Sequence, residues 1–357
     1  MLIIDLINFA IINYMKRIRV AINGFGRIGR AFVRVAWERP EIEIVAINDL
    51  GDIKNLAYLL KYDTVYHTWP HDVSVSPEGK FFIIDRRKQI AYISQKDPMQ
   101  LPWQGFNVDV VVESTGLFES FEKSKVHLAA GAKHVVISAP AKDPEREDSK
   151  TVLLGINEDE FKNCKITSNG SCTTNAAHPV IQVLHEALGI KKAFLSTTHG
   201  YTATQGLVDG LTRGSDFRRG RAAAEHIVPS STGAAVSVTR AVKDLAGKFD
   251  GVALRVPVVC GSVAQITFVA GRQTTVEEVN DILKKAAAEP RWNKIFKVTE
   301  EQIVSSDIIG ESHAAVADLN FTRVVDGDLV SVMSWYDNEM GYTHALVEHV
   351  IKAGESL

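Results

Sequence analysis

The sequence of 357 residues predicts an α/β protein, in which a doubly wound parallel sheet is followed by a mixed, largely antiparallel α+β domain. Three observations support this prediction. Short apolar runs alternate with helical patterns in the first half, as in parallel sheets with crossover helices. A glycine-rich turn joins the first apolar run to the first helical pattern. After about residue 172, long strand-like runs follow one another with fewer helices between them, which favours antiparallel pairing.

The first elements form a strand, helix and strand unit. Residues 18–23 are a short apolar strand, 27–37 a helix, and 42–47 a second apolar strand that ends at Asn48 and Asp49. The expected elements that follow are a helix near 53–62, a polar hairpin over 81–93, a strand over 109–112, a helix over 121–129 and a strand over 134–138. This alternation predicts parallel strands joined by helices.

The second half is expected to contain strands over 253–259, 263–271 and 329–335, and a last helix over 338–352. Between them, residues 207–221 contain several glycines and charges but little periodicity, which predicts a long ordered loop. Long loops in compact enzymes are usually functional. We find no low-complexity linker and no repeat of fixed period, so the two domains are expected to pack tightly.

Composition limits the partners that the chain can have. A formal charge of −3 gives no general attraction to nucleic acid or to an anionic membrane, so a small-molecule partner is expected. The three cysteines Cys164, Cys172 and Cys260 are irregularly spaced and form no CxxC pair. This pattern argues against a disulfide framework and against a zinc site, so no metal is predicted and a reducing cytoplasm is expected.

Residues 1–14 are apolar but too few to span a membrane, and they lack the basic start and the cleavage site of a secretion signal. Two interpretations stay open. The preferred one is an upstream start codon in the gene model, with the natural chain beginning at Met15. The other is an amphipathic tail that docks on the body or on a partner. In either case we treat 1–14 as an N-terminal extension to which no motif belongs.

A glycine-rich turn predicts a dinucleotide site. Gly24, Gly26 and Gly29 follow an apolar strand and open a helix, so the backbone can approach a pyrophosphate at the helix N-terminus. Asp49 ends the second strand, where a carboxylate can accept hydrogen bonds from ribose hydroxyls and repel a 2′-phosphate. NAD rather than NADP is therefore the expected cofactor. An alternative role for Asp49 is to cap the helix near Ile53, and both roles could hold.

Cys172 and His199 are predicted to meet. A helix from Cys172 to about Leu188 climbs roughly 24 Å, and a strand that ends at His199 returns roughly 23 Å. A thiol beside an imidazole and at a helix N-terminus is expected to be stabilised as thiolate, which is its reactive form. The pair therefore predicts a nucleophile with its base, against the alternative of a buried cysteine and a hydrogen-bonded histidine that serve structure alone.

The chain from about Met15 to its end resembles the phosphorylating glyceraldehyde-3-phosphate dehydrogenases. The resemblance rests on motifs that occur in the family's order and at its approximate spacing. They are GFGRIGR (24–30), the Asn48 and Asp49 pair, STGLF (114–118), SNGSCTTN (168–175), HGYTATQ (199–205), PSSTGAA (229–235), RVP (255–257) and WYDNEMGY (335–342). No single motif decides the matter, but all of them agree.

This resemblance implies a Rossmann NAD-binding domain over 15–171 plus 338–357 and a catalytic domain over 172–337. It implies reversible conversion of D-glyceraldehyde 3-phosphate to 1,3-bisphosphoglycerate with NAD and inorganic phosphate, through a thioester on Cys172. The family is a homotetramer in which the loop over 207–221 lies near the cofactor of an adjacent subunit. No nucleic-acid or membrane partner is required.

The resemblance also implies binding residues. For the cofactor it implies Arg27 and Ile28 at the pyrophosphate, Ser114 and Thr115 nearby, Asn338 at the nicotinamide carboxamide, and Lys96 where many relatives have an arginine near the adenine. The substrate's phosphate is assigned to Thr202, Arg219 and Arg255, and the attacking inorganic phosphate to Ser171, Thr173, Thr232 and Gly233. Charge-assisted bonds from arginine with hydroxyl and amide donors suit both anions.

Besides Lys96, the sequence departs from the resembled family at three positions. Ala176 stands where most relatives carry a second cysteine, Gly170 replaces a common alanine, and Leu211 replaces a common proline. None of these changes removes a catalytic group. Two other functions remain as alternatives: erythrose-4-phosphate dehydrogenase, against which Thr202 and the motifs at 202–205 and 229–235 argue, and a nucleotide or RNA scaffold, against which the intact Cys172 and His199 argue.

Overall fold

The computed structural model describes residues 17–212 and 214–357, so the expected extension over 1–14 lies outside the described residues. The chain forms two compact units. The first runs up to Lys150 and includes Asp159–Ser168 and Leu346–Leu357, and the second comprises Thr151–Glu158 and Asn169–Ala345. The last helix, α8 (Met340–Glu355), begins in the second unit and ends in the first.

The first unit is built on a sheet of nine described strands. Its central strands run parallel, and they are β5 (Lys88–Ile93), β2 (Ile42–Asn48), β1 (Ile18–Asn23), β6 (Val110–Glu113), β7 (His134–Ile137) and β9 (Ile166–Ser168). Strands β3 (Val73–Val75) and β4 (Phe81–Ile84) extend one edge in antiparallel fashion, and β8 (Ser149–Thr151) ends the other. The sheet order is β3-β4-β5-β2-β1-β6-β7-β9-β8.

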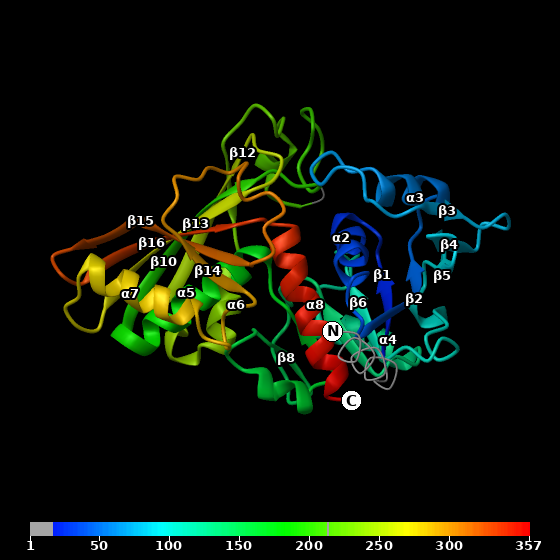
Figure 1. The fold of residues 1–357 in the computed structure, drawn as a ribbon, viewed down its shortest axis with the longest axis horizontal. Helices are drawn as coiled ribbons and strands as arrows, with labels where there is room; N and C mark the ends of the chain where they lie inside the picture. Colours follow the sequence, from blue (N-terminus) through cyan, green and yellow to red (C-terminus); the bar gives the residue numbers. More distant parts are fainter. Residues whose placement is uncertain (1–16, 213) are drawn as a thin grey trace, which may run out of the picture. The chain divides into compact units, whose positions relative to one another are not determined.

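Helices α2 (Arg27–Ala36), α3 (Ile53–Lys61) and α4 (Phe121–Ala129) connect strands of this unit (Figure 1). All four residues of β6 are buried, because a parallel strand between packed layers buries both of its faces. Trp103 and Phe121 belong to a cluster of buried apolar residues that includes Ala21 of β1 and Val111 of β6. The predicted doubly wound α/β fold is therefore confirmed.

The second unit contains a mixed sheet of seven described strands, in the order β11-β12-β10-β13-β16-β15-β14. These strands are β10 (Ile190–Gly200), β11 (Val228–Ser231), β12 (Phe249–Val256), β13 (Ser262–Ala270), β14 (Phe296–Thr299), β15 (Ala315–Val325) and β16 (Leu329–Tyr336). Only the β10–β12 and β14–β15 pairs are parallel, so the expected mixed, largely antiparallel domain is confirmed.

Three helices pack on this second sheet (Figure 1): α5 (Cys172–Leu188), α6 (Ala234–Ala241) and α7 (Val276–Ala287). Side chains that alternate with the buried ones along the strands stay exposed, among them Phe194 at 48%, Val252 at 43% and Leu329 at 41%. One face of the sheet is thus covered by helices, and the other presents apolar side chains to solvent.

Several element predictions need correction. The strand expected over 253–259 is β12, which ends at Val256, and β15 was missed. A register irregularity in β15 between Asp318 and Arg323 interrupts the period-two pattern by which strands are recognised. The loop over 207–221 contains a short 3-10 helix at Phe217–Gly220.

Candidate active site

Cys172 is the first residue of helix α5, and its position is determined by the residues just before it. The Ser171 hydroxyl accepts from the Thr174 N–H (3.0 Å), and the Ser171 N–H donates to the Thr174 hydroxyl (3.1 Å), which forms a reciprocal capping box. Gly170 has φ of +67°, a conformation that favours glycine. The chain therefore turns sharply into the helix and places the thiol at its N-terminus.

His199 lies at the end of strand β10, and its Nε2 is 3.3 Å from Cys172 Sγ. The predicted meeting of the two side chains is confirmed, because α5 has the expected bounds and β10 contains the expected strand, although it is longer by a few residues. Tyr336 packs edge-on against the imidazole, with ring centroids 5.8 Å apart. Its hydroxyl exchanges hydrogen bonds with Thr173 (2.9 Å) and Thr197 (2.7 Å), which connects the start of α5 to β10.

Burial dominates the electrostatics of this pair. It raises the pKa of the Cys172 thiol above its usual value, while the nearby positive charge of Arg255 opposes the shift. Burial and then Arg255 lower the pKa of His199 to about 3. Desolvation therefore works against the expected thiolate, while Arg255 and the hydrogen bonds at the helix start work toward it, and the stabilised thiolate stays a prediction.

The residues expected to hold the substrate's phosphate make different contacts. Arg255 Nη1 lies 2.7 Å from His199 Nδ1, so this arginine is in direct contact with the pair. Arg219 donates through Nε to the Ser230 hydroxyl (3.1 Å) on β11, the strand that pairs with β12, which carries Arg255. Thr202 and Thr204 hydrogen bond through their hydroxyls (2.9 Å). The structure thus brings Arg255, but not Thr202 or Arg219, into hydrogen-bond contact with His199.

The donors expected for inorganic phosphate lie at two helix starts. Ser171 caps α5, and Thr173 lies in its first turn. Gly233 is the N-cap of α6, and the Thr232 hydroxyl accepts from the Ala234 N–H (3.2 Å). Helix N-termini present backbone N–H groups with a positive dipole end, which suits an anion.

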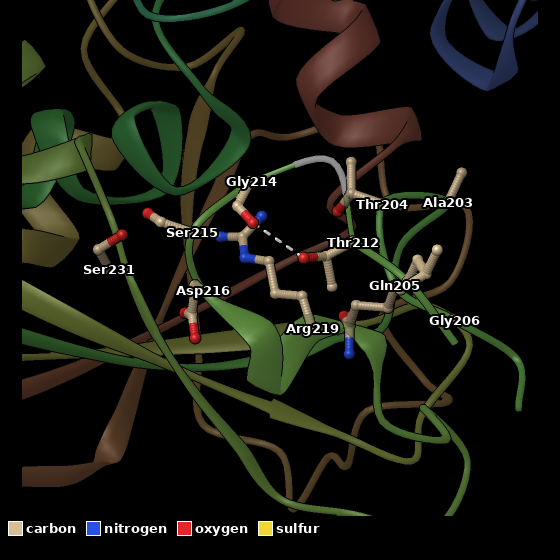
Figure 2. Close-up of a pocket in the computed structure, with 11 residues that line it drawn as sticks. Ala203, Thr204, Gln205, Gly206, Thr212, Gly214, Ser215, Asp216, Arg219 and Ser231 are labelled. Atoms are coloured by element: carbon tan, nitrogen blue, oxygen red, sulfur yellow. Dashed lines mark hydrogen bonds between the residues drawn. The ribbon is translucent and has the colours of Figure 1, made fainter. Parts of the chain in front are cut away.

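A cavity of about 660 Å³ in the second unit opens between the loop that follows β10 and strand β11 (Figure 2). It is lined by loop residues that include Thr204, Gln205 and Ser215, together with Arg219 and Ser231. Neither Cys172 nor His199 lines it. Arg219 is thus the expected phosphate ligand that opens onto this cavity.

The first unit contains a cavity of about 290 Å³ at the carboxyl ends of β1, β2 and β6. Six of the expected cofactor residues line it: Gly24, Gly26, Asp49, Lys96, Ser114 and Thr115. The expected residues Arg27, Ile28 and Gly29 do not line this cavity, and Arg27 instead pairs with Asp63 (3.0 Å).

The expected cofactor residue Asn338 belongs to the second unit. Its Oδ1 accepts from the Gly261 N–H (3.1 Å) and the Ser262 hydroxyl (3.0 Å).

The three glycines of the glycine-rich turn are needed for different physical reasons. A Cβ on Gly24, whose φ is +96°, would lie 2.6 Å from Thr115 N, and one on Gly29 would lie 2.3 Å from Gly24 O. A Cβ on Gly26 would meet nothing within 4 Å. Gly24 and Gly29 are therefore required by close packing, whereas Gly26 leaves room at the helix N-terminus for a ligand to approach the backbone.

Asp49 is fixed by two backbone donors. Its carboxylate accepts from the Phe25 N–H (2.7 Å) and the Gly51 N–H (2.8 Å), which ties β2 to the glycine-rich turn. The alternative that Asp49 caps helix α3 is wrong, because the N-cap is Asp52, which accepts from the Asn55 N–H. Asp49 is thus held at the cavity edge with further oxygen lone pairs available.

A buried polar network beneath the cavity was not predicted. Glu113, at the end of β6, accepts from Asn23 Nδ2 (2.6 Å) at the end of β1 and from the Thr115 N–H (2.8 Å). Asn48 Nδ2 donates to Asn23 Oδ1 (2.7 Å), which extends the network to β2. Polar residues at the ends of three neighbouring apolar strands were the available signal, but single strands do not show which ends adjoin.

Comparisons with known proteins match most of the chain to one family. Family profiles described as "Glyceraldehyde 3-phosphate dehydrogenase, NAD binding domain" and "Glyceraldehyde 3-phosphate dehydrogenase, C-terminal domain" match residues 18–121 and 171–338. The chain is 45% identical over 346 residues to glyceraldehyde-3-phosphate dehydrogenase of Mycobacterium leprae, covering 95% of this chain and 99% of the relative. It is 45% identical over 333 residues to that of Clostridium pasteurianum, covering 92% and 96%.

Within the described part of the chain, no helix is both long and apolar enough to cross a membrane.

Proposed function

Because the chain belongs to the glyceraldehyde-3-phosphate dehydrogenase family, whose members are NAD-dependent oxidoreductases, we propose that it converts D-glyceraldehyde 3-phosphate reversibly to 1,3-bisphosphoglycerate with inorganic phosphate. The observation that carries this proposal is the contact of 3.3 Å between Cys172 Sγ and His199 Nε2 at the N-terminus of α5. A thiol and an imidazole at this distance are a nucleophile and a base within reach of each other.

The first half of the reaction forms a hemithioacetal on Cys172. His199 Nε2 takes the thiol proton as sulfur attacks the aldehyde carbon and passes it to the developing oxyanion, which becomes the hemithioacetal hydroxyl. The developing oxyanion is held by the backbone N–H of Cys172 and by His199, and the positive end of the α5 dipole favours the negative charge. Burial of the pair strengthens these interactions, because they act in a medium of low dielectric constant.

The second half of the reaction uses the same two residues. NAD, when bound, supplies the acceptor for the hydride that leaves the substrate carbon. His199 accepts the hydroxyl proton, and a thioester remains on Cys172. Phosphate held by Ser171, Thr173, Thr232 and Gly233 then attacks this thioester, which forms the acyl phosphate and releases the cysteine. Thr202, Arg219 and Arg255 hold the substrate's own phosphate.

The residues around the cavity in the first unit fit a dinucleotide. The open space beside Gly26 and the N–H groups at the start of α2 suit a pyrophosphate, with Arg27 and Ile28 beside it. Asp49 accepts hydrogen bonds from the ribose hydroxyls. Lys96 lies near the adenine, Ser114 and Thr115 contact the cofactor nearby, and Asn338 binds the nicotinamide carboxamide. We assign the NAD-binding domain to 15–171 plus 338–357 and the catalytic domain to 172–337.

We further propose that the protein is a cytoplasmic homotetramer. The uncovered face of the second sheet supports assembly, because Phe194, Val252 and Leu329 leave apolar area in water there. Leu211 and Phe217 in the loop over 207–221 are likewise exposed. Burying such side chains between subunits would be worth up to about 1.5–3 kcal/mol each.

The test is the formation of NADH, followed by its absorbance, from D-glyceraldehyde 3-phosphate and NAD with and without phosphate or arsenate. The proposal predicts that NADH forms only when the aldehyde is present and that its formation depends on added phosphate or arsenate. A higher kcat/KM with erythrose 4-phosphate would assign the chain to the related dehydrogenase instead. Absence of turnover with either aldehyde would contradict an enzymatic function.

A further inference from the structure

His199 Nδ1 has two neighbours that require opposite states of it. Gly200 O lies 2.6 Å from Nδ1 and can only accept a hydrogen bond. Arg255 Nη1 lies 2.7 Å from the same nitrogen and can only donate one. A ring nitrogen of neutral imidazole carries either a proton or a lone pair, so Nδ1 can satisfy only one of these neighbours at a time.

The other ring nitrogen faces the nucleophile, since Nε2 lies 3.3 Å from Cys172 Sγ. If Nδ1 accepts from Arg255, the ring proton is on Nε2, which then donates toward the sulfur. If Nδ1 donates to Gly200 O, Nε2 carries the lone pair and can accept a proton. The state of Nδ1 therefore decides whether His199 presents a donor or an acceptor to Cys172.

The contacts of Arg255 favour the first state while the guanidinium is in place. Nη1 also lies 3.3 Å from Gly200 O, and its two N–H groups can serve Nδ1 and that carbonyl together. Neither acceptor is then left without a donor. The imidazole stays neutral throughout, because burial and the charge of Arg255 lower the pKa of His199 to about 3. The choice is thus between two tautomers.

We propose that Arg255 is a positioning residue that sets the tautomer of His199 and that an anion binding to Arg255 reverses it. With the guanidinium on Nδ1, the proton is on Nε2. When an anion draws the guanidinium away, Nδ1 takes up a proton and donates a hydrogen bond to Gly200 O. Nε2 loses its proton at the same time, so the net charge of the ring is unchanged. This inference rests on the proposed function, in which Arg255 binds the substrate's phosphate.

The consequence is a link between substrate binding and the base. The proposed reaction needs Nε2 as an acceptor, first for the thiol proton and later for the hydroxyl proton. A bound phosphate would create that acceptor at the moment when the aldehyde arrives. Without it, Nε2 donates toward sulfur and the base is not available.

The test is ¹⁵N NMR of the full chain labelled in histidine, which distinguishes a protonated ring nitrogen from one with a lone pair and assigns each through its couplings to the ring protons. The His199→Asn variant identifies the signals of His199. We expect the proton on Nε2 in the wild type without anions, and on Nδ1 in Arg255→Leu. Glycerol 3-phosphate, which carries the substrate's phosphate without its aldehyde, should move the wild type to the Nδ1–H form and leave Arg255→Leu unchanged.

Arg219→Leu is the matched control. Arg219 is the other proposed phosphate arginine, but it contacts Ser230 rather than His199, so its loss should leave the tautomer without anions as in the wild type. The inference is overturned if wild type and Arg255→Leu share one tautomer without anions, or if glycerol 3-phosphate at concentrations that inhibit turnover leaves the wild-type proton on Nε2. The glycerol 3-phosphate titration needs no variant, so it stays informative if Arg255→Leu does not fold.

NADH formation measured on the same samples distinguishes failure of this inference from failure of the proposed dehydrogenase function. Turnover of the aldehyde with an unchanging tautomer would leave the function standing and remove the switch. A tautomer that depends on glycerol 3-phosphate in a protein that does not turn over the aldehyde would remove the function and leave the coupling of Arg255 to His199.

Discussion

Three cysteines in one chain have three different environments, and only one of them suits catalysis. Cys164 is buried, and burial raises its pKa to about 11. Cys260 is also buried, and its thiol donates to Asp337 Oδ1 (3.2 Å). Cys172 keeps part of its surface exposed although the surrounding protein desolvates its thiol, and it contacts the side chain of His199. Reactivity therefore follows access and the neighbouring base rather than thiol chemistry alone.

We predict that Cys172→Ser abolishes NADH formation, and that His199→Asn slows it by about 10²–10⁴-fold because general-base assistance is lost. Iodoacetate should label Cys172 first, as mass spectrometry of the digested protein would show. Cys164→Ala is the control and should retain activity. Faster labelling of Cys164 or Cys260 without loss of activity would contradict the assignment.

Asp49 is predicted to determine cofactor preference. Asp49→Gly should narrow the preference for NAD over NADP in kcat/KM, because it removes both the ribose acceptor and the charge that repels a 2′-phosphate. Asp52→Ala is the matched control: it removes a nearby carboxylate that caps α3, and should lower stability by about 1 kcal/mol with the preference unchanged. A wild type that used both cofactors equally would show that Asp49 has another role.

At the level of elements, two histidines and one hydroxyl join β7, β9 and α8 inside the first unit. The Thr167 hydroxyl lies 3.0 Å from His134 Nε2 and 2.7 Å from His349 Nε2. Phe161 packs edge-on against His349, with centroids 4.7 Å apart. Burial lowers the pKa of His134 to about 4 and that of His349 well below its usual value. The contact thus requires both rings to be neutral.

These pKa shifts predict an acid-sensitive fold. The folded state keeps His134 neutral down to about pH 4, whereas the unfolded chain binds a proton near pH 6.5. The contribution of His134 to the free energy of unfolding is therefore complete above pH 6.5. It is lost as the pH is lowered toward 4, which decreases the free energy of unfolding by about 3 kcal/mol. Urea unfolding at a series of pH values measures this slope.

His134→Gln should flatten that slope, because glutamine cannot take up the proton. His67→Asn, at an exposed histidine, is the control and should leave the slope unchanged. Equal slopes in wild type and His134→Gln would show that other groups cause the acid sensitivity.

Elements with a strong local pattern could be predicted from the sequence, and elements whose formation depends on neighbours could not. Helix α5 and strand β10 follow from periodicity, and their lengths were enough to place Cys172 beside His199. The irregular strand β15 has no such pattern. Glu113 was missed for a related reason, since its partners Asn23 and Thr115 become visible only when β1 and β6 are known to be neighbours. Sequence patterns also do not report burial depth, so they do not show that desolvation raises the pKa of Cys172.

For the whole molecule, the exposed apolar face of the second sheet leads to a prediction on assembly. Light scattering of an active sample should give a tetramer, and Val252→Asp should yield smaller species because it places a charge in the proposed interface. Tyr58→Asp, at an exposed side chain of α3 in the first unit, is the control and should leave the mass unchanged. A monomeric mass in an active wild-type sample would contradict the proposal.

Ala176 lies one turn along α5 from the nucleophile and is fully buried, and the two other cysteines of the chain are buried as well. A peroxide that oxidises Cys172 to a sulfenic acid would thus find no second thiol on the same helix with which to form a disulfide. The oxidised sulfur must then wait for a thiol from solution, such as a small cellular thiol, or proceed to irreversible sulfinic acid. Recovery of this site from oxidative damage is therefore set by the surrounding thiol pool and not by the chain itself.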